Sequence, residues 1–181
     1  MKKYAIAYAA NASVSMFTKE DLTSLTHINL AFGLVDGHRL DMSQLTNIEI
    51  TRRLREWNPN IKILVSVGGW GAGGFSEMAM TAAGREAFAR SCLEAVEKYD
   101  LDGVDIDWEY PCSSQADIAS DPRDKENFTL LLRALRHSLQ DRILSIAAGA
   151  GEYFIEGTEM DIVSDIVDYV QIMTYDLRNG F

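Results

Sequence analysis

The sequence predicts an α/β fold in which parallel strands are joined by helices, and three observations point to it. Apolar, strand-like runs alternate with helix-like segments along the 181 residues, as in sheets whose parallel strands are connected by crossover helices. The strand-like runs are continuously apolar, which is typical of strands buried on both faces. Both an open doubly wound sheet and a (β/α)8 barrel bind ligands at the carboxyl ends of such strands, so both architectures fit. Polar and aromatic residues do gather at these ends: Trp70, Glu109, Tyr110, Tyr175 and Asp176.

The first half of the chain supplies three expected strands, at residues 4–10, 27–34 and 61–67, each an apolar run. Thr18 with an acid three residues later predicts a capped helix start, and this helix should end near residue 25. Apolar residues at helical spacing predict a second helix over residues 43–57, which the following Asn-Pro-Asn stops.

The second half begins with a helix that opens at Ser76 or Thr81 and runs to residue 99, with Phe88, Cys92 and Val96 on one face. A later helix over residues 122–140 has Asp121 as its expected N-cap and Pro122 in its first position. Its apolar face consists of Phe128, Leu131, Leu132 and Leu135. The other expected elements are a strand through Asp105 and Asp107, a strand over residues 143–148, a short helix near 161–166 and a sixth strand over 169–175.

Charge and composition exclude several classes of partner. The formal net charge is -10, which argues against binding the phosphate backbone of nucleic acids or an anionic membrane surface. No window is apolar enough to span a membrane, and the first ten residues fit a strand better than a signal peptide. Cys92 and Cys112 have no metal-binding spacing. These features leave the compartment open between secreted and cytoplasmic.

One strand carries an unusual row of acids. Val104 and Ile106 alternate with Asp105, Asp107 and Glu109, so the three carboxylates share one face of a strand. The Cα atoms of one acid and the next are roughly 7 Å apart. No Lys or Arg is interleaved, and like charges in a row destabilise a fold. Clustered carboxylates that perturb one another are typical of functional sites. The strand is therefore predicted to carry the chemistry of the protein.

A divalent cation site is the alternative for these acids. Carboxylates on one straight strand do not wrap a cation well, and no oxygen-rich loop like that of an EF-hand flanks them. No nucleotide-binding glycine motif occurs either. We therefore expect no metal and no organic cofactor.

Three motifs together resemble glycoside hydrolase family 18, the chitinases and their relatives. The run DGVDIDWE at residues 102–109 resembles the DGxDxDxE signature of that family, SVGGW at 66–70 resembles its SxGG strand end, and QIMTYD at 171–176 resembles its MxYD strand end. The resemblance covers essentially the whole chain and implies a TIM-type (β/α)8 barrel. The version with Tyr110 and Pro111 after the acid is closer to chitinases than to the endo-β-N-acetylglucosaminidase branch.

The match also has a departure from the family. The family's barrel has eight strands, whereas about six βα units are expected in this chain. In addition, the Trp that the family's final strand usually contributes to the barrel floor has no counterpart in this sequence. We therefore expect residues 1–181 to be part of a family 18 catalytic barrel that lacks its last units. A missing C-terminal segment or another chain would complete the barrel.

The resemblance implies a role for each site residue. Glu109 would be the general acid and base, with a pKa raised by its acidic neighbours and by partial burial. Asp107 would orient the 2-acetamido group of the substrate, Asp105 would share a proton with Asp107, and Tyr175 would donate its hydroxyl to the acetamido oxygen. The residues expected to bind or stack on the sugar are Trp70, Gly69, Tyr110, Met173, Asp176, Tyr8 and Phe32.

The implied function is the hydrolysis of β-1,4-linked N-acetylglucosamine, as in chitin, through a retaining mechanism in which the substrate's own acetamido group attacks the anomeric carbon. Two alternatives remain. One is a non-hydrolytic, oligosaccharide-binding lectin on the same barrel, although such relatives lose the acid that this chain keeps as Glu109. The other is an endo-β-N-acetylglucosaminidase that acts on glycans.

Overall fold

Six parallel strands form one sheet in the computed structural model, which describes residues 3–176. The neighbours in the sheet follow the order β1-β2-β4-β5-β6-β7, and the short strand β3 pairs antiparallel with β2. All six predicted strands are therefore confirmed. Their bounds are β1 Ile6–Ala10, β2 His27–Asp36, β3 Arg39–Asp41, β4 Lys62–Gly68, β5 Gly103–Asp107, β6 Ile143–Gly149 and β7 Tyr169–Met173.

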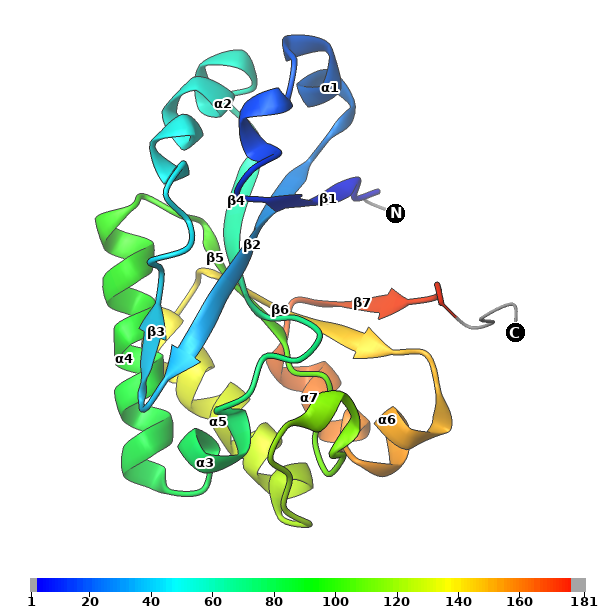
Figure 1. Cartoon of the computed structure of the whole chain (residues 1–181). Helices are drawn as coiled ribbons and strands as arrows, with labels where there is room; N and C mark the ends of the chain where they lie inside the picture. The colour runs from blue at the N-terminus through cyan, green and yellow to red at the C-terminus, as the bar shows by residue number, and fades with distance from the viewer. Residues whose placement is uncertain (1–2, 177–181) are drawn as a thin grey trace.

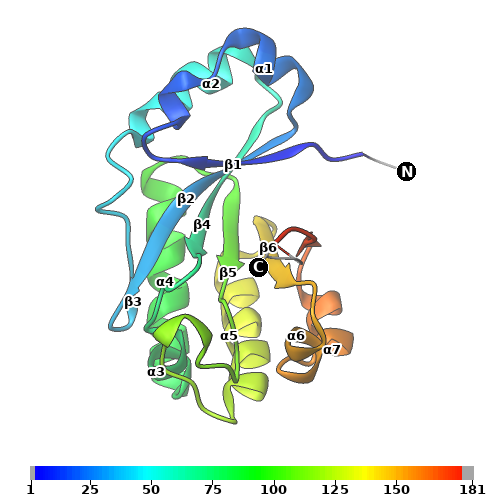
Figure 2. The same ribbon diagram turned by 45° about the vertical axis from the view of Figure 1, so that its right-hand side comes forward.

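Helices connect the parallel strands, and the two longest, α4 and α5, pack side by side (Figures 1 and 2). Their predicted apolar faces are confirmed, because Phe88 and Cys92 of α4 and Leu131 and Leu135 of α5 are fully buried. Burial of such side chains stabilises the fold by about 2 kcal/mol each. The helices are α1 Lys19–Ser24, α2 Thr51–Trp57, α3 Phe75–Ala79, α4 Ala82–Lys98, α5 Asp124–Leu139, α6 Glu152–Glu156 and α7 Met160–Ile166. No helix of residues 3–176 is both long enough and apolar enough to cross a membrane.

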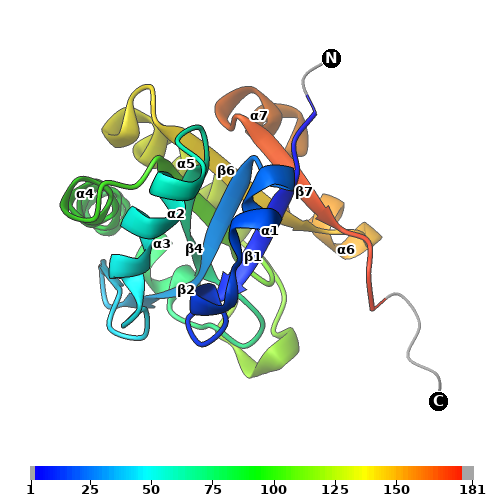
Figure 3. The ribbon, with the colours of Figure 1, turned by 90° about the horizontal axis from the view of Figure 1, so that it is seen from above.

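The sheet is curled, as the view from above shows (Figure 3). Tyr8 of β1 donates a hydrogen bond to Asp105 of β5 at 2.8 Å, although β2 and β4 lie between these strands. In a flat sheet, three strand spacings would separate them by about 14 Å. Gln171 of β7 reaches the same carboxylate from the other edge, at 2.9 Å. The described residues therefore form an open, incomplete barrel of the (β/α)8 type, and the doubly wound alternative is excluded.

The helix predicted over residues 43–57 is wrong in its first half. The α-helix begins only at Thr51, after a 3-10 turn at Ile48–Ile50. The amide and hydroxyl of Ser43 both bond to the Asp41 carboxylate, and Asn47 bonds to Asn11 through its amide and its side chain. These side-chain contacts compete with helical hydrogen bonds and hold the segment in turns.

Two other helix starts also differ from the sequence-based expectation. The helix predicted from Ser76 or Thr81 is two helices, of which α4 begins at Thr81 as N-cap, with its hydroxyl accepting from Gly84 N. The helix expected from Pro122 begins at Asp124, because the Asp121 carboxylate accepts from Arg123 N and forms a turn before the helix. In contrast, the capping box of Thr18 is confirmed.

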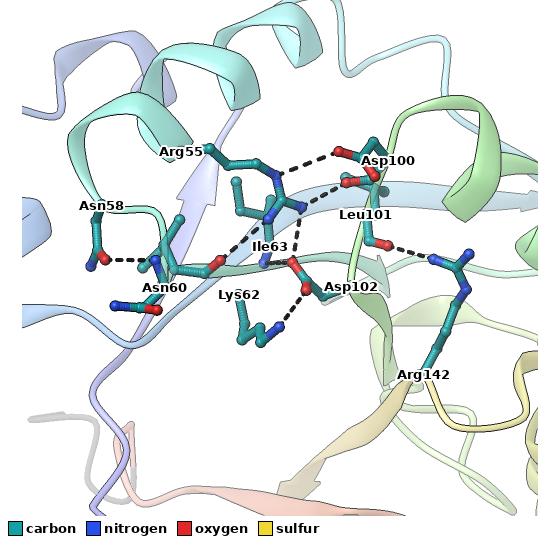
Figure 4. Close-up of polar contacts among 10 residues, drawn as sticks. Arg55, Asn58, Asn60, Lys62, Ile63, Asp100, Leu101, Asp102 and Arg142 are labelled. Carbon is teal, nitrogen blue, oxygen red and sulfur yellow. Dashed lines mark hydrogen bonds and ion pairs between the residues drawn. The ribbon is translucent and has the colours of Figure 1, made fainter.

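An ion-pair network closes the amino end of the sheet (Figure 4). Asp102, just before β5, accepts from Arg55 at 2.9 Å, from Lys62 at 2.8 Å and from the amide of Ile63 at 2.9 Å. Burial by itself would raise the pKa of Asp102, but these three donors outweigh it and lower the pKa. The network joins α2, β4 and the start of β5 at the end of the sheet opposite the predicted site.

Candidate active site

The three acids of the signature lie at increasing height along β5. Asp105 is in the middle of the strand and fully buried, Asp107 is its last residue and 4% exposed, and Glu109 follows two residues later at 9% exposed. No Lys or Arg forms an ion pair with any of the three in the part of the chain that the structure describes. Since unpaired buried carboxylates resist ionisation, the proton affinity of all three is raised.

Asp105 is held from four strands. Its carboxylate accepts hydrogen bonds from Ser66 at 2.8 Å and Ser145 at 2.6 Å, which are its direct partners in the registers of β4 and β6, and from Tyr8 and Gln171. Burial raises the pKa of Asp105, and the four donors oppose that shift. Tyr8 was expected among the sugar-stacking residues, but the structure directs its hydroxyl to this carboxylate.

Of the three acids, Asp107 has the most clearly perturbed pKa. Burial, together with the negative charges of Glu109 and Asp105, raises the pKa of Asp107 to about 8. Its Oδ1 atom is buried without a hydrogen-bond partner among the described residues. A protonated Asp107 relieves the repulsion between neighbouring carboxylates, and a free oxygen is left to meet a ligand.

The end of β4 follows the backbone of β5 closely at this point. The amide of Gly69 donates to the carbonyl oxygen of Asp107 at 2.9 Å. Gly68 has a φ of 119°, and a Cβ atom there would collide with the same carbonyl oxygen, so only glycine fits. The ring of Phe32 packs on Gly69. The glycine pair thereby brings Trp70 to the mouth of the barrel, where it is 65% exposed.

Glu109 lies in the wall of a cavity of about 800 Å³ at the carboxyl end of the sheet. Burial raises the pKa of Glu109, whereas the hydroxyl of Tyr110 opposes the shift. The acidic neighbours that were expected to raise the pKa of Glu109 act instead on Asp107. The residues that line the cavity are Trp70, Glu109, Tyr110, Gln115, Ala150, Gly151, Tyr153, Met173, Tyr175 and Asp176.

Six of the predicted site residues are thus brought into one cavity from the ends of β4, β5 and β7. Asp105, Asp107, Gly69 and Tyr8 do not line it. Phe32 lines a neighbouring cavity of about 520 Å³ that shares Trp70.

The sequence reasoning missed Gln115, Gly151 and Tyr153 in the cavity wall and the serine and Gln171 donors to Asp105. Tyr153 had a usable signal, because it follows the end of a predicted strand and a Gly-Ala-Gly turn. Its ring centroid lies 4.8 Å from that of Tyr110. Gln171 also had a signal, since it alternates with Met173 and Tyr175 along the last strand.

Comparison with known proteins gives a consistent result. The family model described as glycosyl hydrolases family 18 matches residues 4–180. Chitinase A1 of Niallia circulans is 41% identical over 155 residues, which cover 80% of this chain and 22% of the relative. Chitotriosidase-1 of Mus musculus is 29% identical over 184 residues, covering 93% of this chain and 39% of the relative.

Solved structures agree in fold. A family 18 N-acetylglucosaminidase from Paenibacillus barengoltzii superposes with a TM-score of 0.95 at 50% identity, covering 99% of this chain and 56% of that one. The chitinase domain of the spore coat protein CotE from Clostridium difficile superposes with a TM-score of 0.89 at 35% identity, covering 97% of this chain and 50% of that one. The chain thus spans about half the length of these structures. By its motifs, its curled sheet and these matches, the chain belongs to glycosyl hydrolases family 18.

Proposed function

We propose that the protein hydrolyses β-1,4-linked N-acetylglucosamine polymers or oligomers, with retention of configuration. The observation that carries the proposal is a buried column of three carboxylates without cationic partners, which ends with Glu109 in the cavity wall. Burial raises the pKa of Glu109 and so favours its protonated form, which a general acid needs. We also propose that residues 1–181 work as part of a family 18 catalytic barrel.

In the proposed first step, Glu109 gives its proton to the glycosidic oxygen. The acetamido carbonyl oxygen of the substrate attacks the anomeric carbon, the bond to the leaving oxygen breaks, and its electron pair stays with that oxygen. An oxazolinium ion results. In the second step, a water molecule attacks the anomeric carbon and gives a proton to Glu109, which restores the acid. The bond from the anomeric carbon to the acetamido oxygen breaks, and its electron pair returns to that oxygen, which re-forms the neutral acetamido group.

The acids below Glu109 serve the acetamido group in this mechanism. Asp107 accepts a hydrogen bond from the acetamido N–H and offsets the positive charge of the oxazolinium, for which its unpartnered Oδ1 is suited. Asp105 shares a proton with Asp107, and the pair titrates as a unit. The hydrogen bonds from Tyr8, Ser66, Ser145 and Gln171 hold Asp105 in place for this exchange.

Tyr175 completes the acetamido site as a hydroxyl donor. Burial, with the charges of Asp107, Glu109 and Asp176, raises the pKa of Tyr175, so the hydroxyl keeps its proton. Trp70 and Tyr110 supply aromatic faces for the sugar, with Met173, Asp176 and Phe32 in the cavity walls around them. Gly69 acts through the backbone, by placing Trp70.

Replacing Glu109 by Gln tests the proposal. We expect Glu109→Gln to reduce the hydrolysis of a chromogenic chitobioside by about 10³-fold, within the range for loss of a general acid, while oligosaccharide binding persists. The same pair of measurements separates the enzyme from a lectin, because a lectin binds without hydrolysis in the wild-type protein too. Unchanged turnover in the variant would remove Glu109 from its role.

A second candidate activity is the release of single N-acetylglucosamine units, as the name of the Paenibacillus barengoltzii relative states for that protein. Chromatography of early products from a chitin hexamer distinguishes the two activities. Monosaccharide as the first product favours the N-acetylglucosaminidase, and mixed oligomers favour the chitinase. Cleavage of an N-linked glycan would instead support the endo-β-N-acetylglucosaminidase alternative.

A further inference from the structure

A buried carboxylate outside the cavity joins the segments that surround Glu109. Asp124, the first residue of α5, is fully buried. Its Oδ1 accepts from the Ser76 hydroxyl at 2.7 Å, and its Oδ2 accepts from the amides of Asp121 at 2.7 Å and Cys112 at 3.4 Å. None of the ion pairs among residues 3–176 involves Asp124. A hydroxyl and two amides therefore replace the hydration of its charge.

Both ends of the segment of residues 108–112 are attached to the same turn of α3. At the first end, the Trp108 ring stacks on Phe75, with ring centroids 5.2 Å apart and an interplanar angle of 11°. At the second end, the Cys112 amide reaches Ser76, the next residue of α3, through Asp124. Glu109 and Tyr110, which line the cavity, lie between the two attachment points.

At the second end, the Tyr110 ring is 8% exposed and packs on Tyr153 and Phe154 of α6, which do not belong to α3. The Cys112 sulfur lies 3.6 Å from the carbonyl oxygen of Pro122 and 3.8 Å from that of Gly157, and thiols are weak donors. Trp108 and Phe75 are each 1% exposed, so the first end is fixed by packing. The Asp124 carboxylate links the backbone of the second end to α3, through the Cys112 amide and the Ser76 hydroxyl.

We propose that Asp124 is a positioning residue for Glu109, which it holds toward the cavity through Cys112 and Ser76. Asp124 does not line the cavity and so acts without touching substrate. The inference rests on the proposed function of Glu109. Since a misplacement of about 1 Å in a catalytic group costs on the order of 10²-fold in rate, the contact matters for turnover.

The test is Asp124→Asn, which keeps the size of the side chain but replaces one accepting oxygen by a donor. We expect kcat on a chromogenic chitobioside to fall by about 10-fold or more, because the acid is misplaced, while KM stays within about twofold. Ser76→Ala removes only one of the three donors to Asp124 and should lower kcat by a smaller factor of about threefold, because the two amide donors remain. If Asp124→Asn does not fold, Ser76→Ala decides the question: a wild-type kcat in that variant would overturn the proposal.

Asp102→Asn is the matched control, because Asp102 is also a hydrogen-bonded acid beside β5 but lies at the other end of the sheet. Both Asp102→Asn and Asp124→Asn are assayed below their unfolding temperatures. Under these conditions, Asp102→Asn should keep the wild-type kcat. The proposal is overturned if folded Asp124→Asn keeps the wild-type kcat, or if both variants lose kcat equally.

A crystal structure of Asp124→Asn gives a second readout that does not depend on hydrolysis. We expect residues 109–112 to be displaced while Trp108 stays stacked on Phe75. An undisplaced segment contradicts the positioning role. Absence of hydrolysis by the wild-type protein would instead contradict the proposed function, so the two failures are distinguishable.

Discussion

The two ends of β5 hold acids in opposite electrostatic settings. At the amino end, Asp102 is paired with Arg55 and Lys62, and its pKa is lowered. At the carboxyl end, Asp107 has no cationic partner among the described residues, and its pKa is raised to about 8. Only the four residues 103–106 thus separate an acid arranged for stability from an acid whose ionisation works against the fold. Such an unfavourable arrangement persists where function requires it.

The largest expected difference between the two ends is in activity. Asp107→Asn should lower kcat for a chromogenic chitobioside by about 10²-fold, because in the proposed mechanism Asp107 passes its proton to Asp105 and its carboxylate then stabilises the oxazolinium. Asp102→Asn should leave kcat unchanged. Steady-state kinetics of both variants at one pH checks this. Equal losses in the two variants would mean that the carboxyl end has no special role.

The pH dependence of stability should have opposite sign at the two ends. Asp107 has a raised pKa in the folded state, so its contribution is fully present below about pH 4, the unfolded value, and is lost as the pH rises toward 8. Asp102 has a lowered pKa, so its contribution is present above about pH 4 and is lost as the pH falls through the folded-state value.

Thermal unfolding of the variants between pH 3 and 9 tests these signs. Asp107→Asn should unfold at a higher temperature than the wild type at pH 9 and show less loss on raising the pH. Asp102→Asn should lie below the wild type at neutral pH and approach it in acid. Parallel curves for the two variants would contradict the contrast.

The amino-end network should contribute measurably to folding. Asp102→Ala removes the 2.9 Å ion pair of the mostly buried Arg55 and leaves it the 3.9 Å pair with Asp100, and we expect a loss of about 2 kcal/mol in the free energy of unfolding. This is less than for a fully buried pair, since water screens part of the interaction. Urea denaturation measures it, and a loss under about 0.5 kcal/mol, as for an exposed pair, would make the network incidental.

The smallest expected effect belongs to Lys62. Its side chain is 49% exposed, so Lys62→Met should cost about 0.5 kcal/mol, as for other exposed ion pairs. The same denaturation experiment applies, with Lys125→Met as the control, because the Lys125 ammonium donates to the carbonyl oxygen of Glu156 and forms none of the ion pairs among residues 3–176. A larger loss for the control would show that the network at Asp102 adds nothing specific.

Much of the candidate site could be predicted from local sequence. The alternation around Asp105, Asp107 and Glu109 has the period of a strand, and the structure confirms that strand. The sequence also predicted that Trp70 and Tyr175 lie just after the ends of strands. It could do so because apolar runs, and the glycines or polar residues that follow them, are local signals. The start of α2 was missed for two reasons: the turn in which Ser43 bonds to Asp41 is a local signal that was overlooked, and the bonds of Asn47 to Asn11, 36 residues earlier, leave no local pattern.

By itself, the sequence determined the six parallel strands, the order of the acids along β5 and the absence of interleaved cations, since each depends on residues adjacent in the chain. Only the tertiary structure decided which groups meet. The curl of the sheet brings Tyr8 and Gln171 onto Asp105, and burial moves the pKa of Asp107 to about 8. Desolvation and cross-strand contacts depend on residues far apart in sequence, so they arise only when the chain folds.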